Sequence, residues 1–392
     1  MQPLVDGWTI QNGNATGLIV NCHSHNYKIA GCGGGIFIYQ SSPTIQHNII
    51  RDNKAAEYGA DDFIGTGGGI FVNESPATLI EWNVIRNNDS HIDGDGWGGG
   101  IYIHNSGGDT AIRHNEIDHN EASSTIYKPH SGSGIQIYYN AGQIQIIANY
   151  IHDNNPNIET YWGTGIATQY NDNTLIIDNN RITDNSGMSA LGLSYSVPTV
   201  TRNVIINPGC NTGIDLSGHL ELDPLEYAQI INNIIARHDE SNVYINADLP
   251  NQARAEMIHN TLSDAAYGVY VDSGADVIFD RGIVSYHSKE GIHLEVAAQT
   301  ELSVSYTLFT LNTDDGITGS FQLAGAAYYI DPAGYDYHHH HVSDAIDRVM
   351  DGGIAVDIDG DVRPWGSGTT AFDVGADEFT GLHFFLPLIT RP

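Results

Sequence analysis

The stretch His47-Asn48-Ile49-Ile50-Arg51-Asp52-Asn53 decides the fold, because it returns along the chain as Trp82-Asn83-Val84-Ile85-Arg86-Asn87-Asn88 and in further altered copies. Between the copies lies a second repeat, a glycine followed by alternating apolar residues, as in Gly35-Ile36-Phe37-Ile38. Self-similarity at a period of about 20–35 residues indicates a solenoid. The first repeat, Asn followed two residues later by Ile or Leu, begins at Asn48, Asn83, Asn115, Asn149, Asn180, Asn203, Asn233 and Asn260.

Each repeat contains two or three short runs with strand alternation, separated by Gly, Asn, Asp and Ser, and none shows helical periodicity. Stacked strands of this kind predict an all-β fold, a single-stranded right-handed parallel β-helix of about ten coils, each adding roughly 4.8 Å. We expect the repeated asparagines at coil corners, because Asn tolerates the left-handed backbone conformation. Stacked in successive coils, their amides are expected to form a hydrogen-bonded ladder without a chemical role.

The repeats around Asn48 and Asn83, each with a Gly-Gly-Gly-Ile strand nearby, resemble those of right-handed parallel β-helix proteins. That superfamily contains pectate lyases, polygalacturonases, alginate lyases and epimerases, and many secreted bacterial proteins. The resemblance extends over roughly residues 15–330. It implies the fold and leaves the activity open.

A second resemblance lies in Val356-Asp357-Ile358-Asp359-Gly360-Asp361-Val362-Arg363-Pro364 and Phe372-Asp373-Val374-Gly375-Ala376-Asp377-Glu378. These stretches are similar to the terminal segment of many bacterial surface β-helix proteins. The similarity implies an extracellular protein with a β-helix over residues 1–330 and a capping or attachment segment over 331–392. The run His338–His341 departs from the pattern, and we expect it to bind Zn²⁺ or Ni²⁺ only adventitiously.

The net charge is −32, and the only lysines are Lys28, Lys54, Lys128 and Lys289. Without a basic stripe to displace counterions, the chain is not expected to bind nucleic acid or an anionic membrane. A neutral or cation-bridged polysaccharide is a better match for this charge.

Cys22, Cys32 and Cys210 are an odd number, so they do not form a disulfide scaffold, although Cys22 and Cys32 are close enough in sequence to meet in the first coil. The start Met1-Gln2-Pro3 contains no visible signal peptide. The apolar stretch 384–389 is too short to span a bilayer, so no membrane insertion is expected. We expect a mature secreted or cell-surface protein, and a monomer.

The first four intervals between the repeated asparagines are longer than the later ones, and the extra residues fall before the Gly-Ile strand. Because a solenoid stacks equivalent positions, we expect these inserts side by side on one flank, where they would build a site. The alternative is that they fold over one another, with Trp97 and Trp162 packed down on the coils. The inserts are Lys54–Gly67, Asp89–Trp97, Glu121–Ser133 and Asn155–Thr164.

Taking Ile101, Ile135 and Leu193 as inward residues, alternation predicts which side chains point outward beside the inserts. We expect them to form a groove along the axis, in which aromatic and polar side chains bind sugar rings. The predicted outward pairs are Phe37/Tyr39, Phe71/Asn73, Tyr102/His104, Gln136/Tyr138, Ala167/Gln169, Ser194/Ser196, Asp215/Ser217, Tyr244/Asn246, Tyr270/Asp272 and His293/Glu295. The predicted substrate-binding residues are Trp97, Tyr102, Gln136, Trp162, Gln169 and Asp215.

Two reactions fit such a groove. A polysaccharide lyase needs a base, an acid and a neutraliser of the uronate carboxylate, which His104, Tyr138 and Lys128 would supply, flanked by His130 and Asp95. A glycoside hydrolase needs two carboxyls. The acids available for it near the groove are Asp93, Asp95 and Asp215.

Alternate carboxylates around the Gly360 turn, Asp357, Asp359 and Asp361, are candidate ligands for a structural Ca²⁺, with an ordinary acidic turn as the alternative. As function we favour a secreted carbohydrate-active protein that binds a polysaccharide along the first coils and cleaves it. The alternative is a non-catalytic surface adhesion or glycan-binding module.

Overall fold

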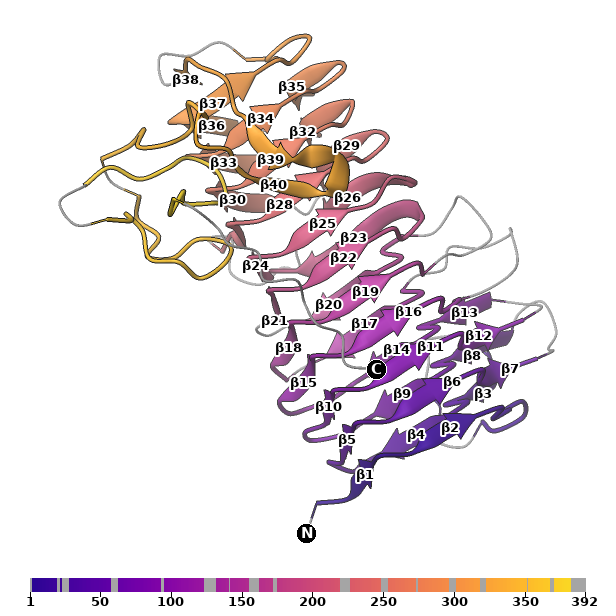
Figure 1. The fold of residues 1–392 in the computed structure, drawn as a ribbon. Coiled ribbons are helices and arrows are strands. Elements are labelled where there is room, and N and C mark those ends of the chain that lie inside the picture. Colours follow the sequence, from indigo (N-terminus) through magenta and orange to yellow (C-terminus); the bar gives the residue numbers. More distant parts are fainter. Residues whose placement is uncertain are drawn as a thin grey trace.

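The computed structural model describes residues 2–19, 22, 28–57, 63–92, 95–122, 132–140, 142–154, 162–171, 175–218, 226–247, 253–272, 274–295, 301–317, 322–350, 352–366 and 370–381. Three long parallel sheets wind around one axis as a right-handed parallel β-helix, which confirms the predicted fold (Figure 1). The only helix in the described residues is one 3₁₀ turn, η1 (Pro332–Gly334).

Each coil contributes one strand to each sheet, and neighbouring strands in a sheet come from successive coils. Sheet 1 contains β1 (Leu4–Asp6), β5 (Thr44–Gln46), β10 (Leu79–Glu81), β15 (Thr110–Arg113), β18 (Ile144–Ile147), β21 (Leu175–Asp178), β24 (Thr199–Thr201), β27 (Ala228–Ile231), β30 (Arg254–Ile258), β33 (Asp276–Asp280) and β36 (Glu301–Ser305). Sheet 2 contains β2 (Thr9–Gln11), β6 (Ile49–Arg51), β11 (Val84–Arg86), β16 (Glu116–Asp118), β19 (Tyr150–His152), β22 (Arg181–Thr183), β25 (Val204–Ile206), β28 (Ile234–Ala236), β31 (Thr261–Ser263), β34 (Ile283–Ser285), β37 (Thr307–Thr310) and β38 (Gln322–Leu323). Sheet 3 contains β4 (Ile36–Tyr39), β9 (Ile70–Asn73), β14 (Ile101–His104), β17 (Ile135–Asn140), β20 (Ile166–Asn171), β23 (Gly187–Ser196), β26 (Cys210–Ser217), β29 (Ser241–Asn246), β32 (Tyr267–Val271) and β35 (Glu290–Leu294).

The core is a column of β-branched and leucine side chains inside the three sheets. Ile80, Ile85 and Ile101 come from the three sheets of one coil, and all three are fully buried. Strand alternation places such residues inside every coil, because successive side chains of a strand point to opposite faces. Each coil therefore contributes one layer of apolar side chains to the core.

The eight repeated asparagines form the predicted ladder. The Nδ2 atom of Asn115 donates to Oδ1 of Asn149 at 3.0 Å, and the same contact joins each of the eight to the next, ending at Asn260. The expectation that these asparagines adopt the left-handed conformation is wrong. The residue before each one does so, including Trp82 (φ 56°) and Arg202 (φ 53°), which leaves the Asn side chain free to turn inward.

A second ladder, which was not predicted from the sequence, follows sheet 2. It joins Asn53, Asn88, Asn120, Asn154, Asn185 and Asn207 by equivalent side-chain hydrogen bonds. In the later coils other residues take this position, including His238 and His287, each two residues after the last paired residue of its strand.

The first two inserts stack on one another, as predicted. β7 (Lys54–Ala56) pairs with β12 (Asp89–His91), and a small side sheet joins β3 (Lys28–Cys32), β8 (Phe63–Thr66) and β13 (Asp95–Trp97). Most of the third and fourth inserts lies outside the described residues. Cys22 and Cys32 form a disulfide beside this side sheet, and Cys210 is buried as a free thiol.

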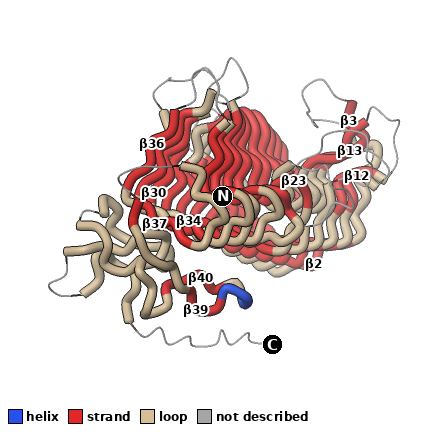
Figure 2. The backbone as a smooth tube through the Cα atoms, turned by 90° about the horizontal axis from the view of Figure 1, so that it is seen from above, coloured by secondary structure: helices blue, strands red, loops and turns tan. Residues whose placement is uncertain are grey.

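The C-terminal segment contains β39 (Tyr329–Asp331), η1 and β40 (Asp336–His339), and its described residues lie against the flank of the solenoid rather than over its end (Figure 2). Its apolar side chains, among them Tyr337 and Val374, pack on Ile234 and Ile283 of sheet 2. The expectation of a cap at the end of the helix is therefore wrong for this part of the segment. The domain division at residue 330 stays a prediction.

None of the described residues belongs to a helix that has the length and apolar character needed to cross a membrane.

Candidate functional site

The outward face of sheet 3 is buried over β9, β14 and β17. Tyr102 is 0% exposed, His104 4% and Tyr138 9%. The indole of Trp97, from the second insert, lies over them, with ring centroids 6.2 Å from Tyr102 and 5.4 Å from Tyr138. The predicted open groove over these coils is thus wrong, and the alternative in which Trp97 packs down on the coil is right.

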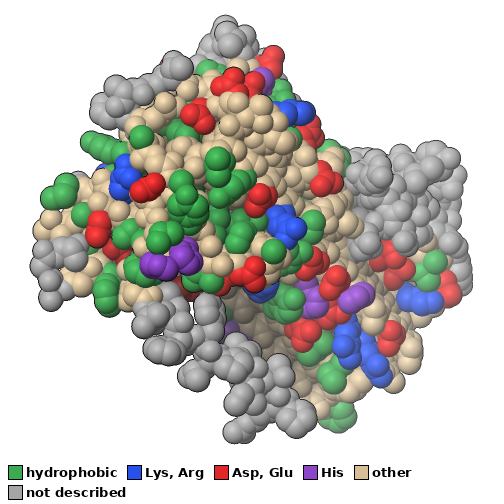
Figure 3. All heavy atoms as spheres, turned by 45° about the horizontal axis from the view of Figure 1, so that its top comes forward, with side chains coloured by type: hydrophobic (Ala, Val, Ile, Leu, Met, Phe, Trp, Pro, Cys, Tyr) green, Lys and Arg blue, Asp and Glu red, His purple; other side chains and the backbone are tan. Residues whose placement is uncertain are grey.

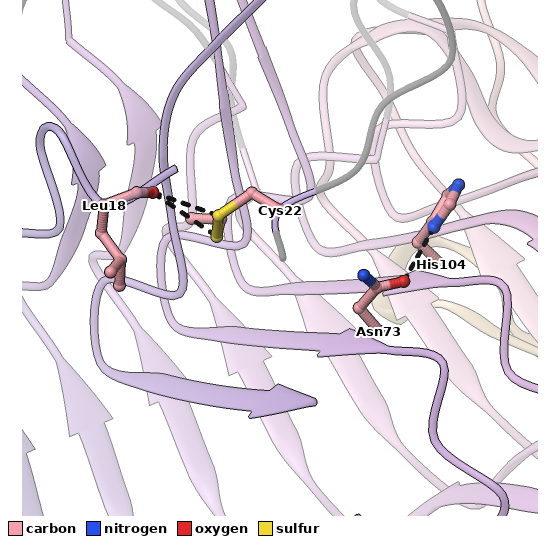
Figure 4. Close-up of a disulfide and its surroundings, with 5 residues drawn as sticks. Leu18, Cys22, Asn73 and His104 are labelled. Carbon is pink, nitrogen blue, oxygen red and sulfur yellow. Dashed lines mark hydrogen bonds between the residues drawn. A yellow bond between two sulfur atoms is a disulfide. The ribbon is translucent and has the colours of Figure 1, made fainter. Parts of the chain in front are cut away.

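The residues predicted for a lyase are only partly brought together. His104 and Tyr138 lie on neighbouring strands with ring centroids 6.1 Å apart, and Nδ1 of His104 is 3.0 Å from Oδ1 of Asn73 (Figure 4). Lys128 and His130 lie outside the described residues, as does the side chain of Asp95, whose backbone belongs to β13. The catalytic roles given to this group stay predictions. Asp93, which was also considered as a hydrolase acid, lies outside the described residues too.

Tyr102 and Gln136, predicted to bind substrate, are both buried, and their binding role stays a prediction. Gln136 is 1% exposed and donates to the carbonyl of Ile137 at 3.2 Å. The hydroxyl of Tyr102 has no hydrogen-bond partner in the described part of the chain, and burial raises the pKa of this phenol well above its usual value. Gln169 differs from them, because it is half-buried.

The predicted alternation slips by two residues in β23. Leu191, rather than Leu193, pairs with Ile166 on one side and Ile214 on the other. The outward pair of this coil is therefore Gly192 and Ser194, because Ala190 takes the place that glycine holds in the other repeats. The shift leaves a position without a side chain in the outward face.

Trp162 fills that gap and contacts Asp215. A Cβ atom on Gly192 would lie 2.5 Å from Cε2 of the Trp162 ring, so the indole rests directly on the glycine. Its Nε1–H group donates to Oδ2 of Asp215 at 2.9 Å. Burial raises the pKa of Asp215 to about 6, although the Trp162 hydrogen bond opposes the shift. Asp215 as a whole residue is half-buried.

Beyond Asp215 the same face is open and carries tyrosines that are hydrogen-bonded to carboxylates. The Tyr244 hydroxyl donates to Oδ2 of Asp272 at 2.8 Å, and the Tyr270 hydroxyl to Oε2 of Glu295 at 3.3 Å. The Tyr244 and Tyr270 rings are 5.4 Å apart and tilted by 48°. All four side chains are at least partly exposed. The tilt leaves aromatic surface uncovered beside hydrogen-bond acceptors.

The last described coils extend this face with charged groups. Nδ1 of His293 lies 2.7 Å from Oε2 of Glu290, and its Nε2 lies 3.5 Å from Oε2 of Glu295. The ammonium of Lys289 lies 4.8 Å from the centre of the Tyr267 ring. These positions were predicted to point outward, but none of them was predicted to have a role; they are Tyr244, Tyr270, Asp272, His293 and Glu295. We call Asp215, Tyr244, Tyr270, Asp272, His293, Glu290 and Glu295 the open face.

A ladder of three tyrosines borders the same sheet. Tyr139, Tyr170 and Tyr195 stack with centroids 4.7 and 4.8 Å apart and ring planes within 13° of parallel. Each adopts a positive φ, which is uncommon for a tyrosine. Because the rings cover one another, their faces are largely used within the stack, and they offer a sugar less surface than the tilted rings of the open face.

The predicted calcium ligands do not form one ligand set. Asp357 accepts backbone N–H groups through both oxygens, from Asp359 (2.9 Å), Asp361 (2.8 Å) and Glu378 (3.0 Å). Asp359 turns instead towards His338. Binding of Ca²⁺ itself stays a prediction.

The remaining motif residues of this segment also hold its backbone. Arg363 is buried and donates to the carbonyls of Gly375 (2.9 Å) and Ala376 (2.6 Å). Glu378 accepts from the backbone of Trp365 (2.9 Å) and Asp373 (3.0 Å). The Asp357 and Glu378 carboxylates each accept backbone N–H groups of this segment, so these motif residues stabilise its fold.

A hollow of about 450 Å³ lies between the solenoid and the C-terminal segment, lined by residues that include Arg237, Asp264 and Tyr337. It is formed against sheet 2, away from the open face. The Tyr337 hydroxyl already donates to Asp264 at 2.6 Å. We assign the hollow no role.

Residues 2–128 and 121–222 match the family described as the right handed beta helix region, and together they span more than half of the chain. No curated protein matches the chain. The fold suits carbohydrate-active and carbohydrate-binding proteins in general. The stacked sheets and this match agree, and the chain belongs to the right-handed β-helix family.

Proposed function

We propose that the chain binds a polysaccharide along the open face and hydrolyses a glycosidic bond there, with Asp215 as the proton donor. The observation that carries this proposal is the contact of Trp162 with Asp215, a carboxyl whose pKa burial raises to about 6 on a face that remains accessible. A carboxyl with such a pKa is partly protonated near neutral pH, as a general acid must be.

Tyrosine rings next to hydrogen-bond acceptors suit sugars, which present apolar ring faces for stacking and hydroxyls for hydrogen bonds. Tyr244 and Tyr270 supply the rings, and Asp272 and Glu295 supply the acceptors. Successive coils repeat this combination along the axis. The arrangement favours a chain of sugars that crosses several coils over a single small ligand.

Asp272 is the second carboxyl of the proposed reaction. It lies two residues after Tyr270, which is in register with Asp215 two strands away, so the two backbone positions are roughly 9.6 Å apart across the sheet and roughly 6.6 Å apart along the strand. The Asp272 carboxylate turns back towards the intervening strand, where it accepts from the Tyr244 hydroxyl, and this brings it closer to Asp215. Inverting glycosidases hold their carboxyls about 6.5–9.5 Å apart to leave room for a water molecule. Asp215 would donate its proton to the glycosidic oxygen, while Asp272 takes a proton from the water that attacks the anomeric carbon. The Tyr244 hydroxyl would hold Asp272 in place.

The alternatives are a lyase centred on His104 and a non-catalytic glycan-binding module. Burial of His104 and Tyr138 by the described residues argues against access of a polymer to a lyase site there. A non-catalytic glycan-binding module needs only the tyrosines and carboxylates of the open face. Cleavage rather than binding is therefore the property to test.

A secreted or cell-surface location and a monomeric state belong to the same proposal. The Cys22–Cys32 disulfide supports an oxidising compartment. Acidic side chains are spread over the face shown in Figure 3, with fewer basic ones among them, which suits a neutral or cation-bridged glycan better than nucleic acid.

The test is release of reducing ends from a panel of neutral and acidic polysaccharides, with and without Ca²⁺. We expect Asp215→Asn to lower the rate by about 10²–10⁴-fold, the usual contribution of a general acid. His104→Gln is the matched variant for the first coils and should cleave like the wild type. Loss that follows His104 instead of Asp215 would move the site back under the inserts, and binding without cleavage by the wild type would establish the non-catalytic module.

A further inference from the structure

Three metal-ligating side chains meet in the C-terminal segment, away from the open face. His338 belongs to β40, Asp359 to the turn after Asp357, and Asp377 to the stretch that packs on sheet 2. One ligand atom from each lies within 4.8 Å of the other two. Nε2 of His338 is 3.1 Å from Oδ2 of Asp359.

Asp377 supplies a second, independent observation. The residue is 1% exposed, and its Oδ2 accepts from the backbone of His339 at 2.6 Å. Its Oδ1 is buried and has no hydrogen-bond partner among the residues that the structure describes. A buried carboxylate oxygen without a donor is costly. Asp373, nearby in the sequence, does accept through both oxygens, from Asp347 and Phe379.

The histidine ring is oriented for binding a cation. Oδ1 of Asp336 lies 2.6 Å from Nδ1 of His338, which turns Nε2 towards Asp359. A carboxylate behind the imidazole is the usual second partner of a metal-bound histidine. Three carboxylates around one imidazole also leave a net negative charge, which a divalent cation compensates better than a single proton on the ring.

We propose that His338, Asp359 and Asp377 bind one divalent transition-metal ion, with Zn²⁺ as the type case. One imidazole nitrogen and two carboxylate oxygens suit Zn²⁺, which takes four ligands at about 2.0–2.2 Å and thus about 3.3 Å from each other. The His338–Asp359 distance is close to this value. Ca²⁺ takes six to eight oxygens and is a poorer match. The ion would tie together three stretches of the C-terminal segment.

A second group, Glu116, Asp118 and His152 on sheet 2, has similar spacing and a histidine oriented in the same way, but among the described residues neither of its carboxylates has a buried oxygen without a hydrogen-bond partner. Oδ1 of Asp118 lies 2.7 Å from Nδ1 of His119, and Nδ1 of His152 lies 2.7 Å from Oδ2 of Asp153. The Glu116 side chain is 47% exposed. This group provides a matched control.

The experiment is titration of Zn²⁺ into the full chain by calorimetry, after purification without a metal column and treatment with a chelator. We expect one Zn²⁺ per wild-type chain and a rise in Tm on binding. Asp377→Asn should weaken binding at least tenfold, since the amide oxygen can still accept from His339 while the charge is lost. Asp359→Asn should act in the same direction, and because its side chain is 47% exposed it keeps the test decisive if Asp377→Asn does not fold.

Glu116→Gln and the double variant His340→Ala/His341→Ala should bind Zn²⁺ like the wild type. Failure of the folded wild type to bind would overturn the proposal, and the three carboxylates would then hold a protonated His338. Unchanged binding in both aspartate variants would also overturn it. Loss of binding confined to the histidine double variant would also overturn the proposal, because it would place the ion on His340 and His341.

Discussion

Equivalent outward positions of sheet 3 are buried over β9, β14 and β17 in the early coils and partly exposed in the later ones. Tyr102 and Tyr270 occupy equivalent outward positions, joined through the register of the strands between them. Tyr102 is fully buried under the inserts, whereas Tyr270 is partly exposed and hydrogen-bonded to Glu295. An outward position is thus not an accessible one. Inserts in the early coils turn this face into a second core, and short later coils leave it available for a ligand.

The largest effect should come from truncating the two tyrosines. Tyr102→Ala should lower the free energy of unfolding by about 3–5 kcal/mol, because it empties a fully packed site. Tyr270→Ala should cost about 1 kcal/mol or less and weaken polysaccharide binding instead. Urea unfolding followed by circular dichroism measures the stability of both variants. Equal losses of stability would show that the two faces are not different.

The early and later coils should also differ in how far acid lowers their stability, because different residues occupy the second ladder in the two regions. Burial lowers the pKa of His238 to about 4, while asparagines hold the equivalent position in the covered coils. Between pH 6.5 and 4 the unfolded chain binds a proton that the folded chain does not, so the stability falls as the pH falls.

His238→Asn should remove up to about 3 kcal/mol of that loss, since each pKa unit is worth about 1.36 kcal/mol. Tm measured from pH 7 to pH 4 tests this, with His341→Asn as an exposed control. A variant as acid-sensitive as the wild type would assign the effect to other groups, with His287 the first to examine.

Blocking the boundary between the regions should have a smaller effect. Leucine at position 192 would displace the Trp162 ring, so Gly192→Leu should break the hydrogen bond to Asp215. We expect about a tenfold loss of polysaccharide cleavage, equivalent to about 1.4 kcal/mol, with a fold that circular dichroism shows to be intact. Gly192→Ala adds a smaller side chain, so its cleavage rate should lie between those of the wild type and Gly192→Leu. Full activity in Gly192→Leu would remove Trp162 from the proposed site.

The smallest effect should be at the exposed end of the open face. Glu290→Gln removes the partner of His293, but surface ion pairs contribute about 0–1 kcal/mol. Its Tm should therefore change little, and high salt should reduce the difference further. Differential scanning calorimetry in low and high salt tests this. A large destabilisation would mean that this end of the face is packed like the first coils.

Periodic features of the fold were accessible from the sequence, because each depends on one coil and its neighbour. The Asn48 ladder and the inward isoleucines follow directly from spacing. The second ladder was also within reach, because Asn53 and Asn88 each follow a repeated asparagine by five residues. The slip in β23 was not, because Gly192 imitates the repeated glycine while Ala190 occupies its place.

The candidate site was harder to predict, because accessibility depends on segments outside the repeat. Alternation correctly placed His104 outward, but nothing periodic shows that Trp97 lies over the neighbouring rings. The contact of Trp162 with Asp215 joins residues 53 positions apart through an insert. Both residues were singled out for their chemistry, yet their meeting depends on the space above Gly192.

The position of the C-terminal segment also has a mechanical consequence. Tyr335 donates to Asp184 beside sheet 2, and Gly375 donates to the carbonyl of Arg281 several coils further on. The described residues of the segment therefore support the later coils laterally, whereas among the described residues the early coils have lateral support from their own inserts alone. A rod that is supported laterally along one region bends and frays more easily where that support is missing. When this molecule is pulled from both ends, the early coils should be the first to peel away.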